Sequence, residues 1–292
     1  MARRARRILT KIASGVALTG MVMGLFATAQ AATIRVTITN NSQINGLHLT
    51  PLYVAFHSAA FDAWEAGVAA SPGLEALAEG GDPSVIAAER TAIDPTSQGG
   101  VIGAPGGFGP APIIEPGETA SAEFDVNEMA NQFFTFLSMV LPSNDTFIGT
   151  DNALQLFDAM GNFLGNRVIA VTGLSLFDAG TEVLDTLGSP FVVGGNGAAG
   201  ATEGGVISTG QSLAAFAGLT LANGQVLDGS LIDFLTGGTN FSLATITIEL
   251  VETAEVPLPA AFIPMLIGLA GLGATARKRR NSTQSSYKMS KI

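Results

Sequence analysis

Two segments far apart in the chain alternate apolar and polar residues with a period of two. Residues 33–39 (TIRVTIT) and 243–250 (LATITIEL) place apolar residues, mostly isoleucine, at alternate positions, with mainly threonine or charged residues between them. Because successive side chains of a strand point to opposite faces, each segment predicts a strand with one buried and one polar face. Further strands are expected at residues 48–56, 119–126, 133–141, 166–172 and 206–208.

Short helices and glycine-rich loops are expected between these strands. Residues 60–69 and 73–80 predict brief helices, and Ser71-Pro72 is a typical helix start before the second. Glycines cluster at residues 99–109 and 194–205, which predicts mobile loops extending from a scaffold. Many short strands, glycine-rich turns and two brief helices together predict an all-β fold, an antiparallel β-sandwich.

The first 31 residues have the pattern of a signal peptide. Five basic residues lie within residues 1–11, an apolar run follows to about residue 27, and residues 29–31 (AQA) form a small-x-small cleavage site. The alternative is an uncleaved N-terminal anchor, which the short apolar run disfavours. The arginine pair at residues 6–7 leaves the choice between general and twin-arginine export open.

The other end predicts a membrane segment. Residues 256–260 (VPLPA) precede an apolar stretch to residue 276, and four basic residues follow at 277–280. A helix over residues 260–276 would be about 26 Å long, slightly short of a hydrocarbon core of about 30 Å. The basic cluster predicts a cytoplasmic tail at residues 281–292, so residues 32–255 form the expected exported domain.

Charge is distributed unevenly along the chain. Of the 14 basic residues only Arg35, Arg90 and Arg167 fall within residues 32–255, whereas all 24 acidic residues do, which gives this segment a net charge of about −21. Nucleic acid is excluded as a partner because it requires a basic surface. The excess of carboxylates suits divalent cations, and halophilic or marine adaptation is the alternative explanation. The chain contains no cysteine, which excludes disulfides and thiolate metal sites.

The sequence offers little for catalysis. His48 and His57 are the only histidines, and no G-x-S-x-G, H-E-x-x-H, phosphate-loop or EF-hand motif is present. His57-Ser58 near Asp62 has the residue types of a triad, but its members must meet in space rather than in sequence. We therefore expect no catalytic residues, and we interpret His57 as a packed or hydrogen-bonded strand residue.

Three carboxylates suggest a metal site. Asp145 follows a hydrophobic strand, and Asp178 and Glu182 flank Gly180 in one loop. Calcium requires hard oxygen ligands of this kind, which two loops at one end of a sandwich can bring together. In so acidic a chain, solvated loop carboxylates are the simpler interpretation on composition alone.

A family resemblance favours the metal site. Residues 52–58 (LYVAFHS), 70–82 (ASPGLEALAEGGD), 137–149 (LSMVLPSNDTFIG) and 177–182 (FDAGTE) together resemble the spondin N-terminal domain, from about residue 33 to residue 190. The resemblance implies a sandwich like that of calcium-dependent phospholipid-binding modules. It also implies calcium ligands at Asp145, Asp178 and Glu182.

The sequence departs from the spondin pattern in several respects. Asn144 replaces the usual proline, and Glu182 is longer than the aspartate of animal members. Their cysteines and thrombospondin-type repeats are also absent, so integrin and heparin binding do not carry over.

The C-terminal segment resembles the VPLPA variety of the PEP-CTERM sorting signal. This resemblance implies processing by an exosortase, with an ordinary single-pass anchor as the alternative. Residues 281–292 extend past the point where such signals end.

We therefore expect an exported, non-enzymatic, calcium-stabilised adhesion or matrix module of the cell surface or biofilm, whose partner is an exopolysaccharide or another surface protein. The alternatives are a structural envelope protein without a working metal site and, less favoured, a secreted hydrolase.

Overall fold

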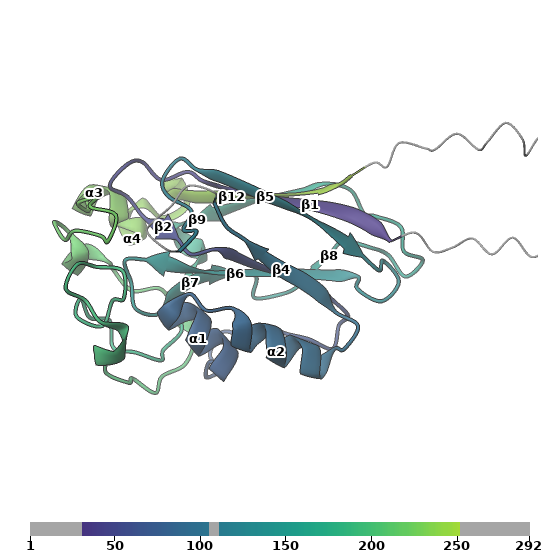
Figure 1. The fold of residues 1–292 in the computed structure, drawn as a ribbon, viewed down its shortest axis with the longest axis horizontal. Coiled ribbons are helices and arrows are strands. Elements are labelled where there is room, and N and C mark those ends of the chain that lie inside the picture. The colour runs from purple at the N-terminus through teal and green to yellow at the C-terminus, as the bar shows by residue number, and fades with distance from the viewer. Residues whose placement is uncertain (1–30, 105–110, 252–292) are drawn as a thin grey trace, which may run out of the picture. The chain divides into compact units, whose positions relative to one another are not determined.

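The computed structural model of the chain describes residues 31–104 and 111–251. Within these ranges the strands form two antiparallel sheets that pack face to face, and two helices lie on the outer face of the larger sheet (Figure 1). The chain is therefore the antiparallel β-sandwich that its sequence predicts, with a layer of helices on one side.

The smaller sheet contains the two strands with the clearest alternation. Its order is β5-β1-β12-β9, and all neighbours are antiparallel. Ile34, Val36 and Ile38 of β1 are fully buried against the other sheet, whereas the residues between them are partly exposed. The strands are β1 (Ala32–Asn40), β5 (Thr119–Val126), β9 (Arg167–Thr172) and β12 (Ser242–Leu250).

The larger sheet is covered on both faces. Its order is β11-β10-β7-β6-β3-β4, and β2 and β8 also pair with β6. In β3, Val54 and Phe56 face the core between the sheets, and Tyr53 and Ala55 face the helices, so the whole strand is buried. The strands are β2 (His48–Leu49), β3 (Leu52–His57), β4 (Gln98–Ile102), β6 (Phe133–Leu141), β7 (Thr146–Gly149), β8 (Leu154–Gln155), β10 (Leu176–Asp178) and β11 (Ser208–Thr209).

Helices α1 (Pro72–Gly80) and α2 (Ser84–Ile93) form the outer layer. Helix α1 begins as the sequence predicts, because the Ser71 hydroxyl accepts a hydrogen bond from the Leu74 N–H at 3.1 Å and proline occupies the first turn. Leu74 packs with Trp64 and Phe147 in a second hydrophobic cluster beneath the helices. Two single-turn helices, α3 (Gly229–Ile232) and α4 (Phe234–Gly237), lie at one end of the sandwich (Figure 1).

Three local predictions are wrong. Residues 60–69 are not helical, because Gly67 N–H and Val68 C=O bond to Ile207 rather than to partners within the segment. The first glycine run is not only a loop, since residues 98–102 form β4 at the edge of the larger sheet. The expected strand over residues 48–56 is interrupted at residues 50–51.

The two predicted export segments lie outside the described residues. This holds for the signal peptide except its last residue, and for the sorting segment with its apolar helix and tail. A search of the described residues for a helix both long and apolar enough to cross a bilayer finds none. Strand β1 begins at Ala32, the residue that the predicted cleavage would leave at the N-terminus.

Candidate metal centre

Asp145 lies in the tight turn between β6 and β7. The Ser143 hydroxyl fixes this turn by accepting a hydrogen bond from Thr146 N–H at 2.9 Å and donating one to Val140 C=O at 2.6 Å. The turn therefore holds Asp145 inside the protein, where its side chain is 0% exposed. Burial of a carboxylate is costly unless a partner compensates its charge.

Asp178 stands beside this turn because β10 pairs with β7, opposite Thr146. Its side chain is buried, and each carboxylate oxygen accepts one hydrogen bond. Gly180 N–H donates to Oδ1 at 2.7 Å, and the Gln211 amide donates to Oδ2 at 2.6 Å. These two donors fix the orientation of the carboxylate.

Glu203 supplies a third carboxylate from the second glycine run. Its N–H donates to Thr181 C=O at 2.9 Å, and the nearby Gly205 N–H donates to Gly180 C=O at 2.7 Å. One oxygen each of Asp145, Asp178 and Glu203 lie within 4.8 Å of one another, the only such group of acidic, histidine or cysteine side chains among the described residues. The glycine run is thus paired with the acidic loop rather than extending freely from the scaffold.

Gly180 is required where these two segments meet. Its φ of +68° lies in the left-handed region, and a Cβ at this position would lie 2.7 Å from the carbonyl oxygen of Val206. Both the backbone conformation and the close approach exclude a side chain. The glycine therefore lets the segment carrying Glu203 lie against the loop carrying Asp178.

The electrostatics of the cluster favour a cation. Burial, and then the neighbouring Asp178 carboxylate, raise the pKa of Asp145 to about 8. Oδ2 of Asp145 accepts a bond from Glu182 N–H at 3.3 Å, but Oδ1 is buried without any hydrogen-bond partner among the described residues. An unsatisfied buried carboxylate oxygen beside two further carboxylates is a donor set of the hard-oxygen type that calcium binds.

Glu182, the third ligand implied by the resemblance, is not a member of this cluster. Its carboxylate accepts a hydrogen bond from the Asn144 amide at 3.0 Å and lies against Gly200. Asn144 also donates to Val183 C=O at 2.9 Å, so the residue that replaces the usual proline ties the two loops together. Whether Glu182 binds a metal stays a prediction.

His57 is a buried, hydrogen-bonded strand residue, as its sequence context predicts. Its Nε2 lies 2.9 Å from the Thr135 hydroxyl, and its Nδ1 lies 2.7 Å from Ser58 C=O. Phe61 packs edge-on against the ring, and burial lowers the pKa of the imidazole. Both ring nitrogens are therefore occupied by structural contacts.

Sequence reasoning missed Glu203 because no local signal marks it. It is one acidic residue beside two glycines, Gly204 and Gly205, in a run that predicts only a loop. Its position follows from backbone pairing with Thr181, which lies 22 residues earlier and belongs to a different loop.

Comparison with known proteins identifies the domain. A search of curated proteins finds no match to this chain. Residues 40–192 match the family described as Spondin_N, close to the range that the sequence blocks indicate. This is a family of non-enzymatic domains and fits a secreted binding module. Because the match covers more than half of the chain, the protein belongs to the Spondin_N family.

Proposed function

We propose that the protein is an exported, non-enzymatic surface-binding module whose loops are fixed by a calcium ion at Asp145, Asp178 and Glu203. The observation that carries the proposal is Oδ1 of Asp145, a buried carboxylate oxygen without a hydrogen-bond partner among the described residues. A divalent cation would neutralise this oxygen together with the two neighbouring carboxylates.

Calcium would act by joining three separate stretches of chain. Asp145 belongs to the β6–β7 turn, Asp178 ends β10, and Glu203 lies in the second glycine run. A cation that binds only the folded state stabilises it in proportion to the logarithm of its concentration over the dissociation constant. The end of the sandwich that carries these loops would thereby become a rigid binding surface.

Thermal unfolding with calcium and with a chelator tests the metal site. We expect calcium to raise the Tm of the wild-type protein, and Asp145→Asn and Asp178→Asn to abolish this rise. Above about pH 8, where Asp145 is ionised, Asp145→Asn should also raise the Tm in chelator, because the amide keeps an acceptor for Glu182 N–H and removes a buried charge. Asp151→Asn is the matched control, since that carboxylate is exposed and lies outside the cluster.

Two further variants distinguish the possible ligand sets. Glu203→Gln should weaken the calcium response if the cluster in the structure is the site, whereas Glu182→Gln should do so if the ligands implied by the resemblance bind the ion. An unchanged Tm with calcium in the wild-type protein would refute both ligand sets. The structural envelope protein without a metal would then be the better proposal.

The proposal extends to export and sorting. The signal-peptide pattern, the VPLPA motif and the basic cluster support a surface protein that an exosortase-type enzyme processes, with an exopolysaccharide or another surface protein as partner. Mass spectrometry of the protein from its native host tests the processing step. Peptides from residues 281–292 in the mature protein would refute cleavage and favour a retained membrane anchor.

A further inference from the structure

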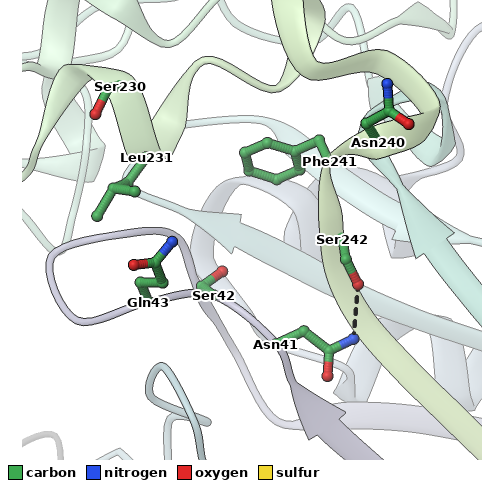
Figure 2. Close-up of a pocket in the computed structure, with 8 residues that line it drawn as sticks. All are labelled: Asn41, Ser42, Gln43, Ser230, Leu231, Asn240, Phe241 and Ser242. Atoms are coloured by element: carbon green, nitrogen blue, oxygen red, sulfur yellow. Dashed lines mark hydrogen bonds between the residues drawn. The ribbon is translucent and has the colours of Figure 1, made fainter.

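A second concave site lies where β1 ends and β12 begins. It is a pocket of about 300 Å³ (Figure 2), and it lies at the end of the sandwich where Figure 1 shows α3 and α4. Six uncharged polar side chains line it: Asn41, Ser42, Gln43, Ser230, Asn240 and Ser242. None of them belongs to the carboxylate cluster, so the pocket is a separate site.

The pocket also has two apolar walls. Leu231 of α3 and the ring of Phe241 lie on opposite sides of the opening in Figure 2. Phe241 packs against Phe234, a fully buried side chain whose ring centroid lies 6.4 Å away in an edge-on arrangement. The part of the Phe241 ring that lines the pocket is therefore fixed in position.

Hydrogen bonds hold the polar wall in place. The Asn41 amide donates to the Ser242 hydroxyl at 2.9 Å (Figure 2) and to the Thr245 hydroxyl, also at 2.9 Å. Ser230 is fixed by Asp228, whose carboxylate accepts bonds from both its N–H and its hydroxyl. Because Asn41, Ser230 and Ser242 are already ordered, contacts between a ligand and these three side chains would cost little additional side-chain entropy.

One polar atom of the wall lacks a partner. The Ser42 hydroxyl is shielded from solvent and forms no hydrogen bond with any described residue. In Figure 2 it points toward the space between Leu231 and Phe241. Because this oxygen has no surface open to solvent, a ligand in the pocket would bond to the accessible polar groups of the wall and not to the Ser42 hydroxyl.

The charge of the lining restricts the ligand class. The segment that forms the domain carries 24 acidic and three basic residues, yet no charged side chain lines this pocket. A cation would find no carboxylate here, and an anion would find no basic side chain. Amides and hydroxyls that both donate and accept hydrogen bonds, set beside an aromatic ring, match a neutral polyhydroxyl ligand.

We infer that this pocket binds a neutral sugar unit of a polysaccharide. Sugar hydroxyls would bond to the amide and serine side chains, and the apolar C–H face of the ring would pack on Phe241. The inference rests on the proposed binding role, but it does not require the metal site. It names the chemical class of the partner that the proposed function leaves open.

Saturation-transfer NMR of the intact protein with neutral hexoses and their disaccharides, with glucuronate as the charged comparison, tests the inference. We expect signals from at least one neutral sugar and none from glucuronate. Asn240→Ala and Gln43→Ala should each weaken binding about fivefold, as expected for loss of one hydrogen bond. Both side chains are exposed and form no hydrogen bond with described residues, so neither substitution should affect folding.

Two controls separate the outcomes. Asn152→Ala changes an exposed asparagine outside the pocket and should leave sugar binding unchanged. Asp145→Asn should abolish the calcium response without affecting the sugar, so the two proposals can fail independently. No signal from any neutral sugar, or binding that Asn240→Ala, Gln43→Ala and Phe241→Leu all leave intact, would overturn the inference.

Discussion

Acidification should destabilise the domain through His48, a fully buried residue of β2. Its Nδ1 lies 3.1 Å from Gly46 C=O, and the Asn223 amide donates to its Nε2 at 3.3 Å. This arrangement fits a neutral ring that is protonated at Nδ1, because a proton on Nε2 would face the Asn223 donor. Burial accordingly lowers the pKa of His48 from 6.5 to about 4.

The sign and size of the effect follow from linkage. Between pH 6.5 and pH 4 the unfolded chain takes up a proton at this histidine and the folded protein does not, so the stability present above pH 6.5 is lost as the pH falls toward 4. For these two pKa values the contribution of His48 to the free energy of unfolding should decrease by about 2 kcal/mol between pH 7 and pH 5.

Urea unfolding at pH 7, 6 and 5 measures this loss. Trp64 is the only tryptophan and is buried beneath the helices, so its fluorescence reports the transition. The comparison is with His48→Gln, which lacks the titrating ring and which we expect to be less stable at pH 7 because the residue is fully buried. Other titrating groups contribute equally to both proteins, so the difference between the two pH dependences isolates His48. Equal losses in the two proteins would refute the reasoning.

Three further predictions concern the site and the outer layer. Gly180→Ala should lower the free energy of unfolding by roughly 1–3 kcal/mol in urea, and weaken the calcium-induced rise in Tm, because the alanine must adopt a left-handed conformation against Val206. Ser71→Ala should cost about 1 kcal/mol by removing the cap of α1, with the calcium response unchanged. In chelator the free energy of unfolding should fall as the pH rises from about 4 to about 8, because over this range the folded protein keeps a proton on Asp145 that the unfolded chain has lost. Asp145→Asn should remove this pH dependence, and calcium should offset it.

Binary patterning predicted the strands whose two faces differ most. Strands β1, β5, β6 and β12 match their predicted ranges to within one residue at each end. In β1, β5 and β12 apolar and polar residues alternate; β6 is almost wholly buried and is predicted instead by a continuous apolar run. The short strands β7 and β10 are missing from the prediction because each spans only three or four residues.

The errors lie where tertiary contacts override local preference. Residues 60–69 have the composition of a helix, but the backbone of this segment bonds to Ile207, and Phe61 and Trp64 fill the cluster beneath the helices. The edge strand β4 contains Gly99, whose missing side chain leaves room for the Arg90 guanidinium and for Val54. Neither arrangement is encoded in the local sequence.

The candidate site likewise contains residues that the sequence could indicate and residues whose place depends on tertiary contacts. Asp145 and Asp178 could be paired from the sequence only because the family resemblance linked their two blocks. Glu203 could not, because its place depends on a long-range pairing with Thr181. The neutral pocket was also unpredictable, since asparagine, serine and glutamine in loops carry no signal until Asn41 and Ser242 meet.

The segment after the family match completes both proposed sites. The match ends at residue 192. Two residues of the carboxylate cluster and its surroundings come later in the chain: Glu203 is the third carboxylate, and Gln211 holds Asp178 in position. Five of the eight residues that line the neutral pocket also follow residue 192. The same segment contributes fully buried side chains, including Phe216 and Phe234, to the core between the sheets. The family region therefore supplies most of the sandwich, and the later segment supplies part of both proposed sites. A difference in ligand between this chain and another Spondin_N protein should consequently map to residues 193–251.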